Sequence, residues 1–151
     1  FIGNTSRGSP EHAARYAGYV RALTGAGIEP SDDLCCAADN SETLGYEAAQ
    51  QLLRSGTPFD ALFAVTDLIA IGAMRAIKDA GLRIPEDIAV VGFDDMPLAA
   101  HVSPALTTMQ QNSRIAAEGL VKGVVGLIKG EPVESALMEP ELIVRESCGA
   151  K

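Results

Sequence analysis

The sequence has 151 residues, of which 47% are hydrophobic, 21% are charged and 5% are aromatic, with no tryptophan. This composition is typical of one globular domain with an aliphatic core and excludes a disordered chain. The net charge of −8 predicts that the chain does not bind nucleic acid by itself, because an acidic body repels phosphate backbones. No run of 18 apolar residues is present, so we expect no membrane partner.

Residues Phe1 to Gly3 are typical of the end of a buried strand, and no initiator methionine precedes them. Because a domain rarely begins inside a core strand, we expect the sequence to be part of a longer protein. The cysteines Cys35, Cys36 and Cys148 are odd in number, and two are adjacent, which does not suit a disulfide framework. We therefore expect small core cysteines and a reducing, cytoplasmic location.

A unit of a short apolar run, a polar turn and an amphipathic helix repeats along the first 95 residues. The apolar runs begin at intervals of 27 to 33 residues, at 1–3, 34–37, 61–65 and 88–93, and predicted helices over 10–23, 41–53 and 67–80 lie between them. Ser9 is the expected N-cap of the first helix, with Pro10 at its first position. Runs that are apolar throughout are buried on both faces. The pattern therefore predicts an α/β fold with a parallel sheet, helices on both sides and right-handed crossovers.

The pattern changes after Asp95. Residues 96–104 are irregular and contain two prolines, and residues 106–110 are expected to form a strand. Apolar residues at helical spacing predict a helix over 115–129, which three glycines interrupt. Residues 139–144 are expected to form a final strand.

Polar side chains follow each predicted strand, at the sheet edge where open α/β folds bind ligands. They are Asn4, Thr5, Ser6, Asp39, Asn40, Thr66, Asp67, Asp94 and Asp95. Arg15, one to two turns into the first helix, would add a guanidinium. Such a ring suits a neutral polyhydroxyl ligand, because each carboxylate accepts hydrogen bonds from two hydroxyls.

The same residue types are common helix caps and turn formers, and this interpretation is favoured for Asp39 and Asp67. For Asp94, which directly follows a six-residue apolar run, ligand binding is favoured. Arg15 is open between a ligand contact and a solvated surface residue.

Other chemistries lack the motifs that they need. His12 and His101 have no zinc-site spacing, and no nucleophile elbow, P-loop or dinucleotide-binding glycine motif is present. The adjacent carboxylates of Asp94 and Asp95 point apart on a strand end and have no third acidic partner for a metal. An enzyme that used one of them as acid or base would also need a nucleophile or a cofactor loop. We therefore expect no metal, no cofactor and no enzymatic activity.

Long blocks of the sequence resemble the LacI/GalR family of bacterial transcription regulators. They include ALFAVTD at residues 61–67, the segment AGLRIPEDIAVVGFDD at 80–95, PALTTMQQ at 104–111 and ELIVRES at 141–147. The resemblance implies a bilobal fold like that of periplasmic sugar-binding proteins. Residues 1–105 would form the C-terminal lobe, 106–130 would cross to the N-terminal lobe, and 131–151 would return. Most of the N-terminal lobe and a helix-turn-helix DNA-binding head would lie outside this sequence.

The resemblance also implies site residues. The effector contacts would be Arg15, Asn40, Thr66, Asp94 and Gln111. Many family members carry a stacking aromatic where this chain has Asn40, which indicates a smaller, more polar or differently seated effector. The homodimer interface would include Ile71, Met74, Arg75, Leu98, His101 and Val102.

By this resemblance the chain is the effector-sensing and dimerisation part of a repressor. A sugar-like or nucleoside-like ligand would bias the angle between the lobes and so control operator binding, and DNA would be contacted only through the missing head. The alternative is an exported solute-binding protein with the same fold. A less favoured alternative is an α/β enzyme.

Overall fold

A computed structural model describes residues 1–4 and 9–150 of the chain. Its sheet has the strand order β1-β2-β3-β4. Strands β1 (Ala61–Phe63), β2 (Ala89–Asp94) and β3 (Thr107–Gln110) are parallel. Strand β4 (Glu141–Ile143) pairs with β3 in the antiparallel direction. The predicted parallel sheet is confirmed for β1 to β3, and the final strand, for which the sequence predicted no direction, runs antiparallel to β3.

The first two predicted strands are reduced to isolated bridges beside β1. Ile2 pairs in parallel with both Ala64 and Cys36, which extends the sheet by two short rungs. The expected strand over 34–37 is cut short because Leu34 belongs to the 3-10 turn η1 (Asp32–Leu34). The Cys35 N–H still donates to the Asp32 carbonyl at 3.0 Å and so stays in that turn.

Three helices connect these strands near their predicted positions. They are α1 (Pro10–Gly25), α2 (Glu42–Ser55) and α3 (Asp67–Asp79). Ser9 is the N-cap of α1 as predicted, although its side chain makes no capping bond. In α2 the Ser41 hydroxyl accepts from the Leu44 N–H at 3.1 Å, and in α3 Thr66 caps the helix in the same way.

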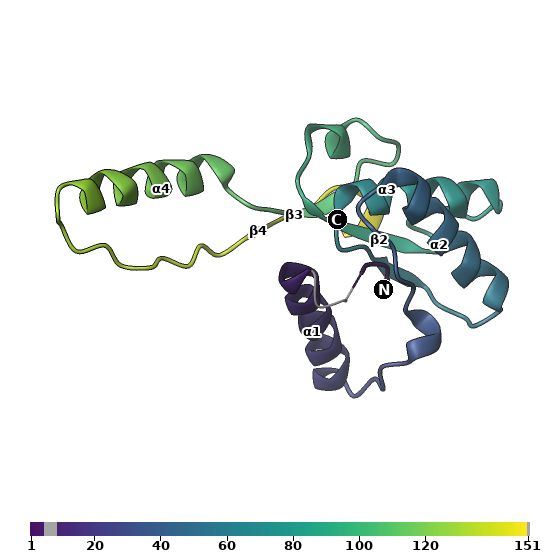
Figure 1. Cartoon of the computed structure of the whole chain (residues 1–151). Coiled ribbons are helices and arrows are strands. Elements are labelled where there is room, and N and C mark those ends of the chain that lie inside the picture. Colours follow the sequence, from purple (N-terminus) through teal and green to yellow (C-terminus); the bar gives the residue numbers. More distant parts are fainter. Residues whose placement is uncertain (5–8, 151) are drawn as a thin grey trace.

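The two faces of β2 contact different helices, because successive side chains of a strand point to opposite sides. On one face, Gly92 lies against Asp67 and Ala70 of α3. On the other face, the Phe93 ring lies under Arg15 of α1. The sheet is therefore covered by α1 on one side and by α2 and α3 on the other (Figure 1).

Helix α2 packs closely along α3 through two buried glycines, Gly45 and Gly72. A Cβ atom added at Gly72 would lie 2.8 Å from the Tyr46 nitrogen, and one added at Gly45 would lie 2.7 Å from the Ile69 Cα. Both distances are shorter than van der Waals contact, so only glycine allows this backbone approach. The packing fixes α3, whose first turn lies at the carboxyl edge of the sheet.

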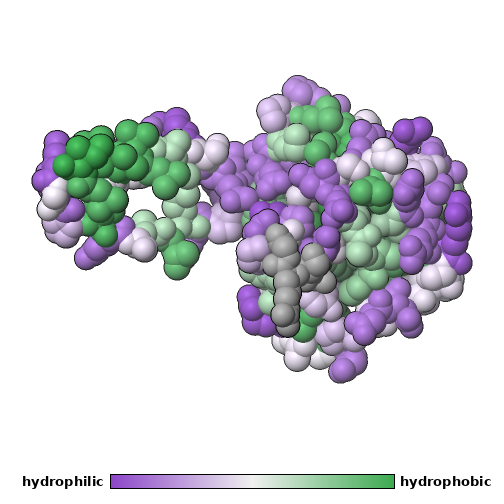
Figure 2. All heavy atoms as spheres, viewed as in Figure 1, coloured by the Kyte–Doolittle hydropathy of each residue, from purple (hydrophilic) through white to green (hydrophobic). Residues whose placement is uncertain are grey.

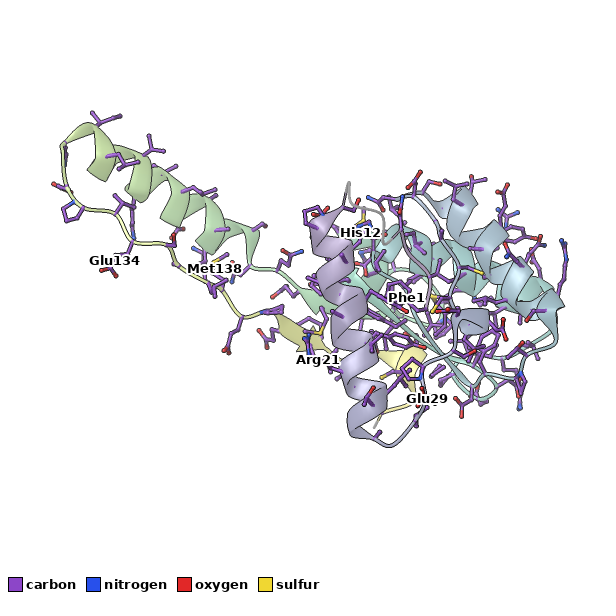
Figure 3. All side chains as sticks on the ribbon, turned by 60° about the horizontal axis from the view of Figure 1, so that its bottom comes forward. Phe1, His12, Arg21, Glu29, Glu134 and Met138 are labelled. Atoms are coloured by element: carbon purple, nitrogen blue, oxygen red, sulfur yellow. The ribbon has the colours of Figure 1, made fainter. Side chains whose placement is uncertain are left out.

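Helix α4 (Ser113–Ile128) and the segment that returns to β4 project from the sheet as an arm (Figure 1). Glu134 and Met138 lie on the returning segment, beside α4 (Figure 3). Apolar side chains gather on the arm (Figure 2), and Leu120 is 72% exposed and Ile128 80% exposed. No helix in the described part of the chain combines the length and hydropathy of a membrane span.

We predict that Gly72→Ala lowers the free energy of unfolding by about 1–3 kcal/mol, because the added methyl group forces α2 away from α3. The matched control is Gly18→Ala in α1, where the nearest atom to an added Cβ is the Arg21 guanidinium nitrogen at 3.7 Å. That variant should be unchanged or gain up to about 1 kcal/mol from helix propensity. Urea denaturation measures both, and equal stabilities for the two variants would contradict the close packing.

Candidate functional site

Asp94 ends β2 at the carboxyl edge of the sheet, in a backbone conformation that is rare for an aspartate. Its φ is +117°, and that of Asp95 is +51°. Positive φ angles cost non-glycine residues about 1–3 kcal/mol each and cluster at ligand sites. The turn after β2 therefore holds the two consecutive carboxylates in a conformation that folding alone does not favour.

Arg15 of α1 lies directly beside Asp94. Its Nη2 is 3.6 Å from Asp94 Oδ1, and the Arg15 and Asp94 side chains are 13% and 31% exposed. Arg15 Nη1 also donates a hydrogen bond to the carbonyl of Val65, two residues after β1 ends. The structure thus brings together two predicted effector residues that are far apart in the sequence.

Burial opposes the charge on both members of this pair. Burial raises the pKa of the Asp94 carboxyl, and the nearby charges of Arg15 and His12 and the hydrogen bond from Gln111 only partly offset it. Burial likewise lowers the pKa of the Arg15 guanidinium, against the effect of Asp94. Two partly dehydrated groups of opposite charge are available here to exchange hydrogen bonds with a ligand.

Gln111 directly follows β3. Its Nε2 donates a hydrogen bond to Asp94 Oδ1 at 3.2 Å. Two neighbouring hollows adjoin this point and share Gln111, Asn112 and Met138. The larger, of about 440 Å³, is lined by Asp94, and the smaller, of about 230 Å³, is lined by Phe93. Both lie where the sheet meets the arm.

Thr66 and Asn40 form a second group. The buried Thr66 hydroxyl donates to Asn40 Oδ1 at 2.8 Å, while Asn40 itself is exposed. Neither residue lines the two hollows. Arg15 links the groups, because the carbonyl that it contacts belongs to Val65, next to Thr66.

The remaining polar residues at this edge contact one another. Asn4 Nδ2 donates to Asp39 Oδ1 at 2.6 Å, in agreement with a structural role for Asp39. The predicted residues Thr5 and Ser6 lie outside the described part of the chain.

Asp67 has a structural role, as its favoured interpretation predicts. It is fully buried in the first turn of α3. Its carboxylate accepts from the Thr108 hydroxyl at 2.6 Å and from the Met96 N–H at 2.7 Å. Burial raises its pKa, and these two bonds oppose the rise.

Asp95 pairs with a different arginine from Asp94, namely Arg145, and the sequence did not indicate this contact. Its carboxylate accepts from Arg145 Nη2 at 2.6 Å and from Gln110 Nε2 at 2.7 Å. Arg145 also donates to the Leu106 carbonyl at 2.8 Å. The chain that returns from the arm is therefore fastened to the turn that carries Asp94. Nothing in the spacing of Arg145 indicates this partner, although it lies within one of the blocks that resemble the LacI/GalR family.

The predicted dimer residues gather on the outer surface of α3 and the turn η2 (Pro97–Ala100). Ile71, Met74, Arg75 and Val102 line a hollow of about 250 Å³. Leu98, in the turn, is 46% exposed, and His101 follows it. Met74 is buried within the chain and packs beneath the exposed residues of this surface.

Two further expectations concern metals and cysteines. Within residues 1–4 and 9–150, no group of three or more His, Cys, Asp or Glu side chains is placed to hold a metal ion. The three cysteines are unpaired, and Cys36 is buried in the core.

A sheet with helices on both faces and an arginine–aspartate pair at its carboxyl edge has the architecture in which open α/β folds bind ligands. The family model described as "Periplasmic binding protein-like domain" matches residues 1–148. The chain belongs to this family. Curated relatives and solved structures that are similar to it are transcription regulators, in agreement with the resemblance seen in the sequence.

Curated relatives support this assignment. The chain is 36% identical to the HTH-type transcriptional regulator CelR of Thermobifida fusca over 135 residues, which cover 88% of this chain and 40% of the relative. It is 35% identical to the HTH-type transcriptional repressor PurR of Pasteurella multocida, with the same coverage. The chain thus spans about 40% of the length of these relatives. Their names are those of regulators and not of enzymes, as the sequence predicted.

Solved structures agree with the fold. The Escherichia coli transcriptional repressor AscG superposes with a TM-score of 0.89 at 30% identity, over 97% of this chain and 54% of the other. A lac repressor dimer bound to operator and the anti-inducer ONPF gives 0.90 at 31% identity, over 99% and 52%. The CelR–cellobiose complex gives 0.82 at 36% identity, over 88% and 41%.

We predict that Arg145→Met lowers the free energy of unfolding by about 2–4 kcal/mol, because it leaves the largely buried Asp95 carboxylate without its cation. The control is Arg114→Met, which removes an ion pair to Glu118 from a side chain that is 80% exposed. That change should stay within about 0.5 kcal/mol. Guanidinium denaturation followed by circular dichroism compares them, and a similar small loss in both would show that Arg145 does not fasten the return segment.

Proposed function

We propose that this chain is the C-terminal, effector-sensing and dimerisation lobe of a LacI-type transcription repressor. In this proposal the crossing that the sequence predicted over 106–130 begins only after β3, because Thr107–Gln110 pair with β2 and β4 in the sheet of this lobe. Helix α4 and residues 131–140 belong to the N-terminal lobe, and the chain returns to this lobe at β4. The rest of the N-terminal lobe and the DNA-binding head belong to the part of the protein outside these residues. The observation that carries the proposal is the Arg15–Asp94 pair at the sheet edge, beside hollows that open towards the arm.

The site suits a small neutral ligand with several hydroxyl groups, such as a sugar or nucleoside. The charges of Arg15 and Asp94 cancel, so the site has no excess charge to attract an anion or a cation. The carboxylate accepts from hydroxyls, and the guanidinium and the Asn40 amide donate to ligand oxygens. The structure of the relative CelR as a complex with cellobiose supports a carbohydrate.

The rest of the proposed mechanism follows from the position of the arm. A ligand held by Asp94 on this lobe and by the lobe to which the arm belongs would stabilise one angle between them. The ligand can shift operator affinity only by its difference in affinity for the two angles. Operator contacts come from outside this acidic chain, in a cytoplasmic protein. The regulator names of the relatives favour this function over the exported solute-binding protein.

We predict that Asp94→Ala and Arg15→Ala each weaken effector binding to the full-length protein at least tenfold, because each removes a charge-assisted hydrogen bond worth about 1.5–3 kcal/mol. Isothermal titration with cellobiose and with adenosine measures the affinity. The control is Asp33→Ala, an exposed carboxylate in η1 that should leave binding unchanged. Wild-type affinity in both site variants would refute the site, and a wild type that binds neither compound would refute the ligand class.

We predict that Leu98→Asp converts the full-length dimer into a monomer, because it places a charge in the apolar part of the proposed interface. The matched control is Ile28→Asp, which changes an apolar side chain that is 54% exposed and lies after α1. Sedimentation equilibrium measures the association state. A Leu98→Asp protein that remains dimeric would place the interface elsewhere.

A further inference from the structure

Phe93 differs from the other phenylalanines of the chain in its surroundings. The chain has four phenylalanines, and Phe1, Phe59 and Phe63 lie in the hydrophobic core or pack against it. Phe93 is only partly buried and lies outside that cluster. Its ring lines the smaller hollow together with Gln111 and Met138. A large aromatic side chain at a hollow, rather than in the core, needs another explanation than packing.

The Phe93 ring supports the guanidinium of Arg15. The Arg15 Cζ atom lies 3.6 Å from the ring centroid, well within the range of a cation–π interaction. The ring belongs to the residue just before Asp94, the carboxylate with which Arg15 pairs. Strand β2 thus supplies two adjacent contacts to one guanidinium, a ring beneath its face and a carboxylate at its edge.

Most of the hydrogen-bonding capacity of Arg15 is unused. A guanidinium has five N–H donors. Within the described part of the chain, Arg15 donates one hydrogen bond, to the Val65 carbonyl, and its 3.6 Å separation from Asp94 is too long for a second. A side chain that is only 13% exposed therefore keeps free donors, and the ring fixes the plane in which they lie.

We propose that Phe93 is a positioning residue of the effector site, which holds the Arg15 guanidinium by a cation–π contact so that its edge faces the ligand. This proposal rests on the proposed function of the Arg15–Asp94 site. Because the ring covers one face of the guanidinium, the ligand is engaged in the plane of the N–H groups. In-plane N–H donors can bond the hydroxyl or carbonyl oxygens of the sugar-like ligand that the proposed function requires.

The test uses the full-length protein labelled with ¹⁵N-arginine, and its first measurement needs no ligand. Relaxation of the Arg15 Nε–Hε group, assigned by its loss in Arg15→Lys, reports the order of the guanidinium. Phe93→Leu should lower its order parameter to below about 0.6. Phe93→Tyr, which keeps the ring, should retain the wild-type value. Phe59→Leu removes a ring that packs on the core instead and should leave Arg15 ordered.

The second measurement is the affinity for cellobiose in the same variants. Phe93→Leu should weaken binding about 5- to 30-fold, the range of a partly dehydrated cation–π contact, and Phe93→Tyr should restore most of it. In the Arg15→Lys background, the effect of Phe93→Leu should shrink, because the two residues act through one contact. An Arg15 side chain that stays equally ordered in Phe93→Leu would overturn the proposal. If the wild type binds neither cellobiose nor adenosine, the proposed ligand class is contradicted, while the order parameters still decide the role of Phe93.

Discussion

The rest of this site depends on two ion pairs, in which two consecutive carboxylates each lie beside a different arginine. Asp94 lies beside Arg15, and Asp95 is held by Arg145 at 2.6 Å. Adjacent side chains at a strand end point in different directions, so one short turn contacts both the first helix and the chain that returns from the arm. The turn that carries Asp94 is therefore attached directly to the chain that returns from the arm.

This arrangement also explains how an acidic chain can carry a neutral binding site. The net charge of −8 is spread over the molecule, but the two carboxylates at the end of β2, Asp94 and Asp95, each lie beside an arginine. Burial raises the pKa of Asp94 and lowers that of Arg15, so both charged forms are less well solvated than in water. Ligand hydroxyls would replace water as their partners, which is the chemistry that sugar recognition requires.

Much of the fold could be predicted from the sequence because its elements follow local rules. Pro10 and Ser41 mark the starts of α1 and α2, and the continuous apolar run at 88–93 indicates the buried strand β2. The direction of β4 could not be predicted, because it depends on where the arm ends and not on the residues of the strand. The run at 34–37 was apolar enough for a strand, but the turn before it left a single bridge.

For the candidate site, too, some features could be predicted from the sequence and others depend on the tertiary structure. The sequence by itself determined that polar side chains follow the strands and that Asp94 comes directly after a buried run, because local hydrophobic patterns indicate where strands lie along the chain and which of them are buried. Only the tertiary structure decided that Arg15 lies over Phe93 and that Arg145 meets Asp95. These contacts join residues that are 50 or more positions apart, and their formation depends on the packing of whole helices and strands, which no local pattern encodes.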